Sequence, residues 1–510
     1  MNANLRKEIR IVMPVVVSCV TIIWMAAGVG FFEWSLVPAV FRGGAGFVIV
    51  AAFFSGCVFL GIRPFCAEFQ HHTMSLVLVQ PMSRWELWAT KRAVQFFSLI
   101  LLLGSMFALL AIVLVLHGVP GKAELEKLFA SNSSELWDAA SFLLIPLMAY
   151  LTGPFWALHV RKTLAAATIG VAAPFIIAVP VLLWAEFSGV EPRFDFVLVP
   201  ELGYIALCLV FARRRFMRLQ MTDGGLGSEI DLIGRFSHLF RAANVSSERT
   251  RQSGGWALFK KELCLQQAPL LICLLMLVIF GVMLLSDRIS PVPEYFFRED
   301  NRFGKYLAIL GFYVFMVPLI SGCIAMSEER ASGIHPWQIT LPVSRTRQWL
   351  IKLAALICTN LILVEIVPGL LLVLYPDLRA QVLDRNGDEF IVGFVSINAG
   401  LMILSFYVGS LCRSTIAAIL ATIGAAVYVI MAFIVALQLA HAANPQSPGY
   451  LWILLSTVAP AIIAAVLLLL SLGNYGRAEM SNPRRLRQVL GVCSFLAVLV
   501  FVLGRIIFEF

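Results

Sequence analysis

Apolar runs of about 20 residues, the length of a transmembrane helix, alternate with short polar segments along most of the chain. A helix rises about 1.5 Å per residue and the hydrocarbon core of a bilayer is about 30 Å thick, so each run can cross a membrane. The pattern predicts an all-α polytopic membrane protein with six spans in each half and one extra C-terminal span. The predicted spans are 11–32, 46–66, 92–116, 138–158, 163–186, 194–212, 267–285, 304–325, 350–374, 389–411, 414–437, 450–472 and 488–508.

A polar, Gly- and Ser-containing segment separates the two halves. The predicted organisation is a first six-helix unit at 1–212, a cytoplasmic linker at 213–259, a second six-helix unit at 260–475, and a basic loop with the extra helix at 476–510. Within the linker, Glu229–Arg241 has apolar residues at helical spacing, which predicts a short helix on the membrane surface. A disordered tether is the alternative for this segment.

The composition agrees with a membrane protein, because 60% of the residues are hydrophobic and only 14% are charged, against about 25% in typical soluble domains. Most Lys and Arg residues fall in segments that share one side of the membrane when the N-terminus is cytoplasmic. An odd number of spans then places the C-terminus outside. We expect a multi-pass protein of a bacterial inner membrane. Basic inner loops beside anionic lipid account for the net charge of +9 without a nucleic-acid partner.

One polar motif occurs twice, as "QPMSRWELWATK" at Gln80–Lys91 and "LPVSRTRQWLIK" at Leu341–Lys352. The repeated pairs are Pro81/Pro342, Ser83/Ser344, Arg84/Arg345, Trp88/Trp349 and Lys91/Lys352. "LRKEIRIVMP" at Leu5–Pro14 likewise resembles "FKKELCLQQAP" at Phe259–Pro269. Both halves begin and end on the same predicted side, so the pattern indicates a parallel duplication.

Each motif lies in the inner loop between the second and third spans of its half. An acidic residue opens each loop: Glu68 in the first, and Glu329 with Glu328 beside it in the second. Proline stops a helix and the following Ser can cap the next one, so each loop predicts a short surface helix, a corner and a capped span. We expect the Trp of each motif at the membrane interface, with Lys and Arg among headgroups. The residues leave two interpretations open: a docking element for a cytoplasmic partner, or a surface helix that only orients the spans.

The loop pattern resembles that of ABC-2 type transporter permeases, in which this loop lies between the second and third of six spans. In that family it forms the coupling helix, which inserts into a cleft of an ATPase subunit. The resemblance implies two tandem six-helix ABC-2 type units, with the extra C-terminal helix outside the family pattern. The implied ATPase-coupling residues are Glu68, His71, His72, Thr73, Pro81, Ser83, Arg84 and Lys91 in the first half, and Glu328, Glu329, Arg330, Gly333, Ile334, Pro342, Ser344, Arg345 and Lys352 in the second.

Two positions depart from the family pattern, since His72 replaces the usual Gly and Ile334 the usual Thr. The two docking surfaces are therefore expected to differ, which leaves open whether the two partners are identical. The sequence has no GxxxxGK[ST], HExxH or GxSxG motif, so we expect no enzyme activity, catalytic residue, metal site or cofactor in this chain. The resemblance implies two separate ABC ATPase subunits that hold ATP and Mg.

Candidate pathway residues are carboxylates and aromatic side chains inside the spans. A charge at the bilayer centre is costly, so Glu365 and Glu201 are candidates either for contacting a polar or cationic part of a cargo or for structural hydrogen bonds. The candidate apolar gate consists of Phe53, Phe54, Phe312, Phe315 and Met316, for which lipid-facing or packed positions are the alternative.

Three functions are compatible with the sequence. The resemblance implies the permease subunit of an ATP-binding cassette transporter that exports a hydrophobic or amphipathic compound. The alternative is an ion- or proton-coupled secondary transporter that uses Glu365, and a third possibility is a membrane-embedded lipid-modifying enzyme. The expected partners are the two ATPase subunits, membrane lipid and the cargo.

Overall fold

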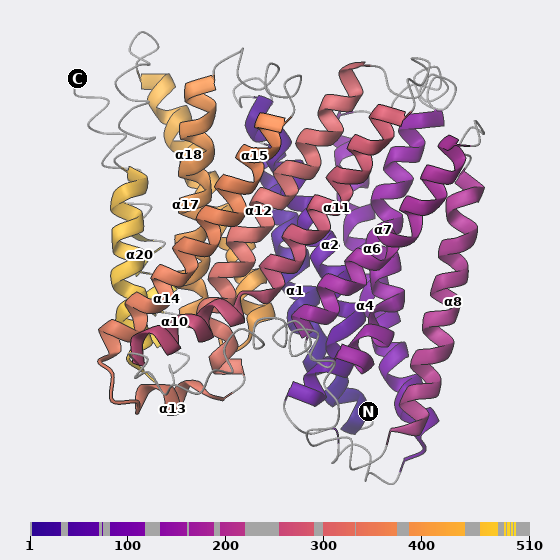
Figure 1. The fold of residues 1–510 in the computed structure, drawn as a ribbon, viewed down its shortest axis with the longest axis horizontal. Helices are drawn as coiled ribbons and strands as arrows, with labels where there is room; N and C mark the ends of the chain where they lie inside the picture. Colours follow the sequence, from indigo (N-terminus) through magenta and orange to yellow (C-terminus); the bar gives the residue numbers. More distant parts are fainter. Residues whose placement is uncertain are drawn as a thin grey trace, which may run out of the picture. The chain divides into compact units, whose positions relative to one another are not determined.

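The computed structural model describes residues 3–31, 39–70, 74, 82–117, 133–160, 163–187, 194–219, 254–289, 299–331, 333–374, 387–443, 459–477 and parts of 484–495. These residues form helices and no strand (Figure 1). A helix satisfies its backbone hydrogen bonds internally, which the hydrocarbon core requires of any spanning segment. The chain divides into two compact units, which are described one at a time.

Unit 1 comprises Met1–Trp24, Ile49–Arg251 and Leu277–Val292. Its helices belong to the first half of the sequence, apart from the end of one helix of the second half. They are α1 (Ala3–Phe31) as far as Trp24, α2 (Ala39–Gln70) from Ile49 onward, α4 (Arg84–His117), α6 (Ser133–Val160), α7 (Thr163–Phe187) and α8 (Phe194–Arg218). Helix α6 packs against α7 and α8, and α4 packs against α8.

Helices α2 and α6 cross closely in unit 1 because glycine lies on both sides of the crossing. A Cβ atom on Gly61 would fall 2.6 Å from the Tyr150 carbonyl oxygen, and a Cβ on Gly153 would fall 2.7 Å from the Gly61 carbonyl carbon. Nearby, Pro64 has no N–H with which to bond the Leu60 carbonyl within the helix. The side-chain amide of Gln95 on α4 donates to that carbonyl instead, at 2.9 Å.

Unit 2 comprises Met25–Val48, Gln252–Met276 and Pro293–Phe510. Its elements are α10 (Gly254–Leu265), α11 (Gln267–Ile289), α12 (Glu299–Ala331), α13 (His335–Ile339), α14 (Arg345–Asn360), the π-helical turn η2 (Leu361–Ile366), α15 (Val367–Leu374), α17 (Gly387–Leu411), α18 (Thr415–Ala443) and α20 (Ala459–Tyr475). Helix α12 packs against α14, α17 and α18, and α17 also contacts α20. The short α13 lies crosswise beyond the ends of α12 and α14 (Figure 1).

Six helices among the described residues are long and apolar enough to cross a membrane, or seven if the bent pair α10–α11 forms one span. The protein is therefore a multi-pass, all-α membrane protein. Each of the first twelve predicted spans overlaps a helix. Most of the thirteenth, 488–508, lies outside the described residues, as does the predicted surface helix Glu229–Arg241.

The two halves differ at their first helix. Helix α1 is continuous although Pro14 lies inside it, whereas α10 and α11 meet at a 49° bend. Gln266 lies at this bend, where its N–H donates to the Leu263 carbonyl and its side-chain amide donates to the Ser321 carbonyl at 3.2 Å. The predicted span 267–285 corresponds to α11, whereas the separate helix α10 before the bend was not predicted.

Candidate functional site

A buried lysine lies on α4, at the base of the loop between α2 and α4. The Nζ atom of Lys91 is 2.7 Å from Glu8 Oε1 and 2.9 Å from Glu68 Oε1, and it donates to the Pro64 carbonyl at 2.8 Å. Lys7 Nζ is 2.9 Å from the same Glu68 oxygen. We call Lys7, Glu8, Glu68 and Lys91 the Lys91 cluster. Its two lysines and two glutamates balance in charge, and only Lys7 has a substantially exposed side chain.

Unit 2 repeats this arrangement at equivalent positions. Lys352 Nζ is 2.8 Å from both Glu262 Oε1 and Glu329 Oε1, and it donates to the Ala325 carbonyl at 3.3 Å. Lys261 Nζ is 2.6 Å from Glu329 Oε1. We call Lys261, Glu262, Glu329 and Lys352 the Lys352 cluster. The repeated sequence motif therefore places the same set of ionic contacts at the base of both loops.

Each cluster ties three chain segments together. The three donors of an ammonium group are all used by two carboxylates and one backbone carbonyl. Removing these charges from water is costly, and only close pairing offsets that cost, so separating the partners is unfavourable. The segment before the first apolar run, the end of the second helix and the start of the third are thereby held as one body. Both ends of the loop between the second and third helices are therefore fixed.

The Ser of each motif caps the helix that follows, as predicted. Ser83 Oγ accepts from the Glu86 N–H at 3.2 Å while the Glu86 carboxylate accepts from the Ser83 N–H at 3.0 Å, which is a capping box. Ser344 Oγ accepts from the Arg347 N–H at 3.3 Å. The sequence separation between cap and partner is three residues, so local sequence sufficed for this prediction.

The Arg of each motif binds the last helix of its own unit. The Arg84 guanidinium donates to the Met217 carbonyl at the end of α8. Arg345 Nη1 donates to the Gly476 carbonyl just beyond α20, at 3.1 Å. The exit of each loop is therefore attached to the final helix of the unit.

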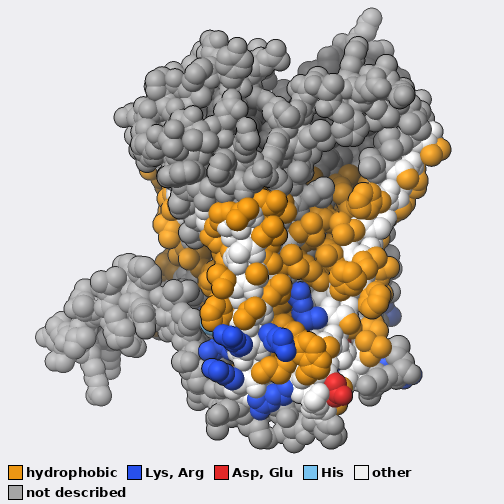
Figure 2. Space-filling model, turned by 90° about the vertical axis from the view of Figure 1, so that its right-hand side faces the viewer, with side chains coloured by type: hydrophobic (Ala, Val, Ile, Leu, Met, Phe, Trp, Pro, Cys, Tyr) orange, Lys and Arg blue, Asp and Glu red, His pale blue; other side chains and the backbone are white. Residues whose placement is uncertain are grey.

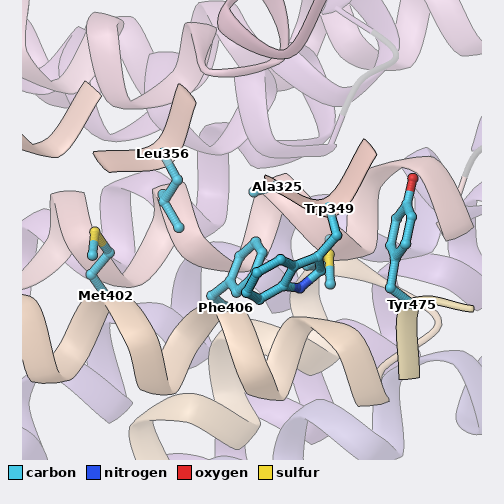
Figure 3. Packing of buried hydrophobic residues seen from close by; sticks show 7 residues of the cluster. Ala325, Trp349, Leu356, Met402, Phe406 and Tyr475 are labelled. Atoms are coloured by element: carbon cyan, nitrogen blue, oxygen red, sulfur yellow. The ribbon is translucent and has the colours of Figure 1, made fainter. Parts of the chain in front are cut away.

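The repeated Trp and Lys are buried within each unit, so the Lys side chains do not lie among headgroups as predicted. Trp88 packs between Phe65 and Phe216, with ring centroids 5.2 and 5.4 Å away. Trp349 lies beside Phe406 at 5.9 Å (Figure 3), and its Nε1 donates to Ser471 Oγ at 3.1 Å. Aromatic side chains pack against the indole rings, and the glutamates of the two clusters pair with the lysines.

The second loop presents apolar side chains outside the spans. After α12 ends, Gly333 adopts φ +72°, a left-handed conformation that glycine tolerates, and the chain then turns into α13. His335 and Gln338 form the buried face of this helix, whereas Trp337 is 78% exposed, Ile334 50% and Leu341 42%. This apolar group is hereafter the α13 tip. The corresponding His71, His72, Thr73 and Pro81 of the first loop lie outside the described residues.

The structure divides the predicted coupling residues into two groups. Glu68, Lys91, Glu329 and Lys352 are buried inside the clusters. Glu328 accepts from Thr415 Oγ1 at 2.7 Å. The Arg330 guanidinium donates to the Ser410 carbonyl and, at 3.1 Å, to the Asn474 carbonyl. These residues hold the loop in place, whereas Gly333, Ile334, Pro342, Ser344 and Arg345 lie at or beside the exposed turn.

The pathway candidates lie on the helices but form no ionic cluster among the described residues. Phe53 and Met316 are buried, and Phe54, Phe312 and Phe315 are half-buried. Glu201 is buried in α8. Glu365 is half-buried in the π-helical turn, where the side-chain amide of Asn398 donates to its Oε1 at 3.4 Å. The hydroxyl of Tyr313 donates to the Leu363 carbonyl of the same turn.

Sequence reasoning missed Glu8, Glu262 and Trp337. The similarity between Leu5–Pro14 and Phe259–Pro269 contained the first two, as "KE" at the same place in both segments. A lysine that recurs in an apolar sequence in both halves indicates that a carboxylate pairs with it in each half, and Glu8 and Glu262 are those carboxylates. Trp337 is absent from the repeated motif, so repetition could not identify it.

We predict that the stability of the folded protein depends on pH through the buried His335 of α13. Burial, and then the neighbouring Arg330, lower the pKa of His335 to about 4, although Glu329 opposes this effect and Lys352 adds to it. Between pH 6.5 and 4 the unfolded chain binds a proton that the folded chain does not, so stability falls as the pH decreases through this window, by up to about 3 kcal/mol. Thermal unfolding of the detergent-solubilised protein at pH 7 and 4.5 measures the loss. His335→Gln should reduce its pH dependence, and an unchanged dependence would contradict the assignment.

No protein-family model, curated protein or solved structure matches this chain.

Proposed function

We propose that this chain is the permease subunit of an ATP-driven transporter that exports a hydrophobic or amphipathic compound. The observation that carries the proposal is the Lys352 cluster beneath the α13 tip, which is repeated as the Lys91 cluster at the base of the first loop. A loop that served only to reverse the chain would need neither a buried ionic anchor nor an exposed Trp. An exposed apolar tip on a fixed base suits a surface that receives force from a partner.

The contacts of unit 2 define how such a force would spread. A push on α13 reaches α12 through the short turn at Gly333, and α12 carries Glu329. Glu329 and Glu262 both bind Lys352, so α10 and α14 must move with α12. Arg345 extends the connection to the end of α20. A rigid displacement of several helices is what alternating access to a pathway requires.

The proposal assigns ATP and Mg to two separate ABC ATPase subunits, one for each loop. These subunits are cytoplasmic, so both loops and the N-terminus face the cytoplasm, in agreement with the distribution of Lys and Arg. The location is then a bacterial inner membrane. The cargo is amphipathic or hydrophobic because the candidate pathway side chains are mostly aromatic.

Trp337→Ala is expected to weaken binding of the ATPase about 30-fold, because an exposed Trp that becomes buried in a partner is a typical hot spot. The wild-type chain is purified with the ATPase encoded by a neighbouring gene, and affinity is measured in detergent with separately purified subunits. Trp256→Ala is the matched control, since Trp256 is also exposed in unit 2 but lies on α10 and not in the loop. Equal affinity of the Trp337 variant and wild type, or no ATPase bound to wild type, would argue against the proposal.

The alternative function, an ion- or proton-coupled secondary transporter, is favoured by one observation. Glu365 lies in a π-helical turn, and such turns occur frequently at functional sites. The chain reconstituted alone in liposomes separates the two functions. Transport driven by a proton gradient without ATPase would support the alternative, whereas transport that requires the ATPase and ATP supports the permease.

A further inference from the structure

Exposed arginines gather where α8 ends in unit 1. Arg213, Arg214, Arg215 and Arg218 occupy its last turns, and all four are exposed. Arg84, also exposed, begins α4 and donates to the Met217 carbonyl between them. These five guanidinium groups are hereafter the α8 arginine group. Within the described residues, no carboxylate forms an ion pair with any of them.

The arginine group is held in a defined position. The Arg213 guanidinium lies 4.6 Å from the centroid of the half-exposed Trp85 ring, a cation–π contact between α8 and α4. Phe216, on the next turn of α8, packs against Trp88 and Phe65 inside the unit. The backbone that carries the arginines is therefore anchored by aromatic packing while their charged ends remain in solvent.

An apolar surface adjoins the arginines. Leu207, Val210 and Phe211 on α8 are exposed, as are Phe96 and Phe97 on α4. Residues three or four apart share a helix face, so Arg214 continues the stripe formed by Val210 and Phe211, and Arg218 follows Arg214. Figure 2 shows Lys and Arg side chains directly below a broad apolar surface on this face. The boundary between apolar and basic side chains fits the boundary between acyl chains and headgroups.

We propose that the α8 arginine group is a binding site for the headgroups of anionic phospholipids. Arg guanidinium forms charge-assisted, often bidentate hydrogen bonds with phosphate oxygens, and Trp85 lies at the interface level that tryptophan favours. The acyl chains of the bound lipid lie along the exposed apolar stripe of α8 and α4. Arg213, Arg214, Arg215 and Arg218 are not among the predicted ATPase-coupling residues, so the proposal does not rest on the proposed function.

At the equivalent positions, unit 2 has only two of the five arginines, Arg345 and Arg477. Arg345 occupies the position in unit 2 that Arg84 occupies in unit 1. Their acceptors are the carbonyls of Gly476 and Met217, so we align the end of α20 with the end of α8 at these two residues. In this alignment the positions of Arg213, Arg214 and Arg215 are occupied in unit 2 by Leu472, Gly473 and Asn474. The position of Trp85 is occupied by Thr346. The lipid site is therefore expected in unit 1 alone.

Native mass spectrometry of the purified full-length chain tests the proposal. The protein is titrated with phosphatidylglycerol and with phosphatidylcholine of the same acyl chains. Each basic residue near an anionic lipid surface strengthens binding about fivefold, so replacing Arg213, Arg214 and Arg215 with Gln should weaken phosphatidylglycerol binding at least about tenfold. Binding of phosphatidylcholine should not change.

Replacing Arg484, Arg485 and Arg487 with Gln is the matched control, because it removes the same charge elsewhere in the chain. A clearly smaller effect of this control supports a local site, and equal losses would show a general charge effect and overturn the proposal. Arg214→Gln alone should give a smaller loss in the same direction if the triple variant does not fold. Unchanged lipid binding with loss of the ATPase partner would instead identify a protein-docking surface.

Discussion

Lys352→Met is expected to destabilise unit 2 by about 3–5 kcal/mol, the usual cost of removing one partner from a buried ionic pair. The substitution leaves Glu262 and Glu329 buried beside one another, and the partly exposed Lys261 is then the lysine that pairs with both. The side chains are similar in length, so loss of charge rather than loss of volume dominates the effect. Thermal unfolding in detergent measures it, and Lys91→Met should behave in the same way in unit 1.

Two further variants separate the ionic cause from a general sensitivity of this position. Lys261→Met removes a lysine whose side chain is 38% exposed, and it should cost only about 1 kcal/mol or less. The triple variant Lys352→Met, Glu262→Gln, Glu329→Gln removes the three buried charged groups of the cluster and keeps only the partly exposed Lys261, so it should recover much of the lost stability. If the single and triple variants were equally unstable, charge imbalance could not be the cause.

Gly61→Ala is expected to cost about 3 kcal/mol, at the upper end for overpacking. Its Cβ would lie 2.6 Å from the Tyr150 carbonyl oxygen and 2.8 Å from the Tyr150 Cα. These are backbone atoms, so no side-chain rotation relieves the contact and α2 and α6 must separate. Thermal unfolding and the yield of folded, monodisperse protein both report the change.

Gly104→Ala provides the control for this prediction, because no described residue outside the adjoining backbone of α4 comes within 4 Å of the Cβ position on Gly104. Alanine has the higher helix propensity, so this variant should be as stable as wild type or slightly more stable. Gly322→Ala extends the test to unit 2. Its Cβ would meet Ser405 Oγ at 1.9 Å and also the Met402 carbonyl oxygen at 2.9 Å, so a second substitution, Ser405→Gly, should restore only part of the stability. Tolerance of Ala at Gly61 would show that the helices do not cross closely there.

The sequence supported correct predictions wherever the physical cause is local. The length and hydrophobicity of each apolar run predicted where the helices lie. Ser83 and Ser344 each cap a helix by accepting a hydrogen bond from the backbone N–H three residues later. The bend at Gln266 and the π-helical turn at Leu361–Ile366 were not predicted. Both depend on partners in other helices, such as the Ser321 carbonyl and the Tyr313 hydroxyl.

The sequence by itself determined that this is a helical membrane protein with a duplicated polar motif, because hydrophobic run length and repetition are properties of the chain alone. Only the tertiary structure decided what the motif does. Lys91 and Glu8 are separated by 83 positions and Lys352 and Glu262 by 90, and no pattern of spacing pairs residues so far apart. Packing of the helices brings them together, because a lysine buried among apolar side chains is stable only where carboxylates and a carbonyl meet it.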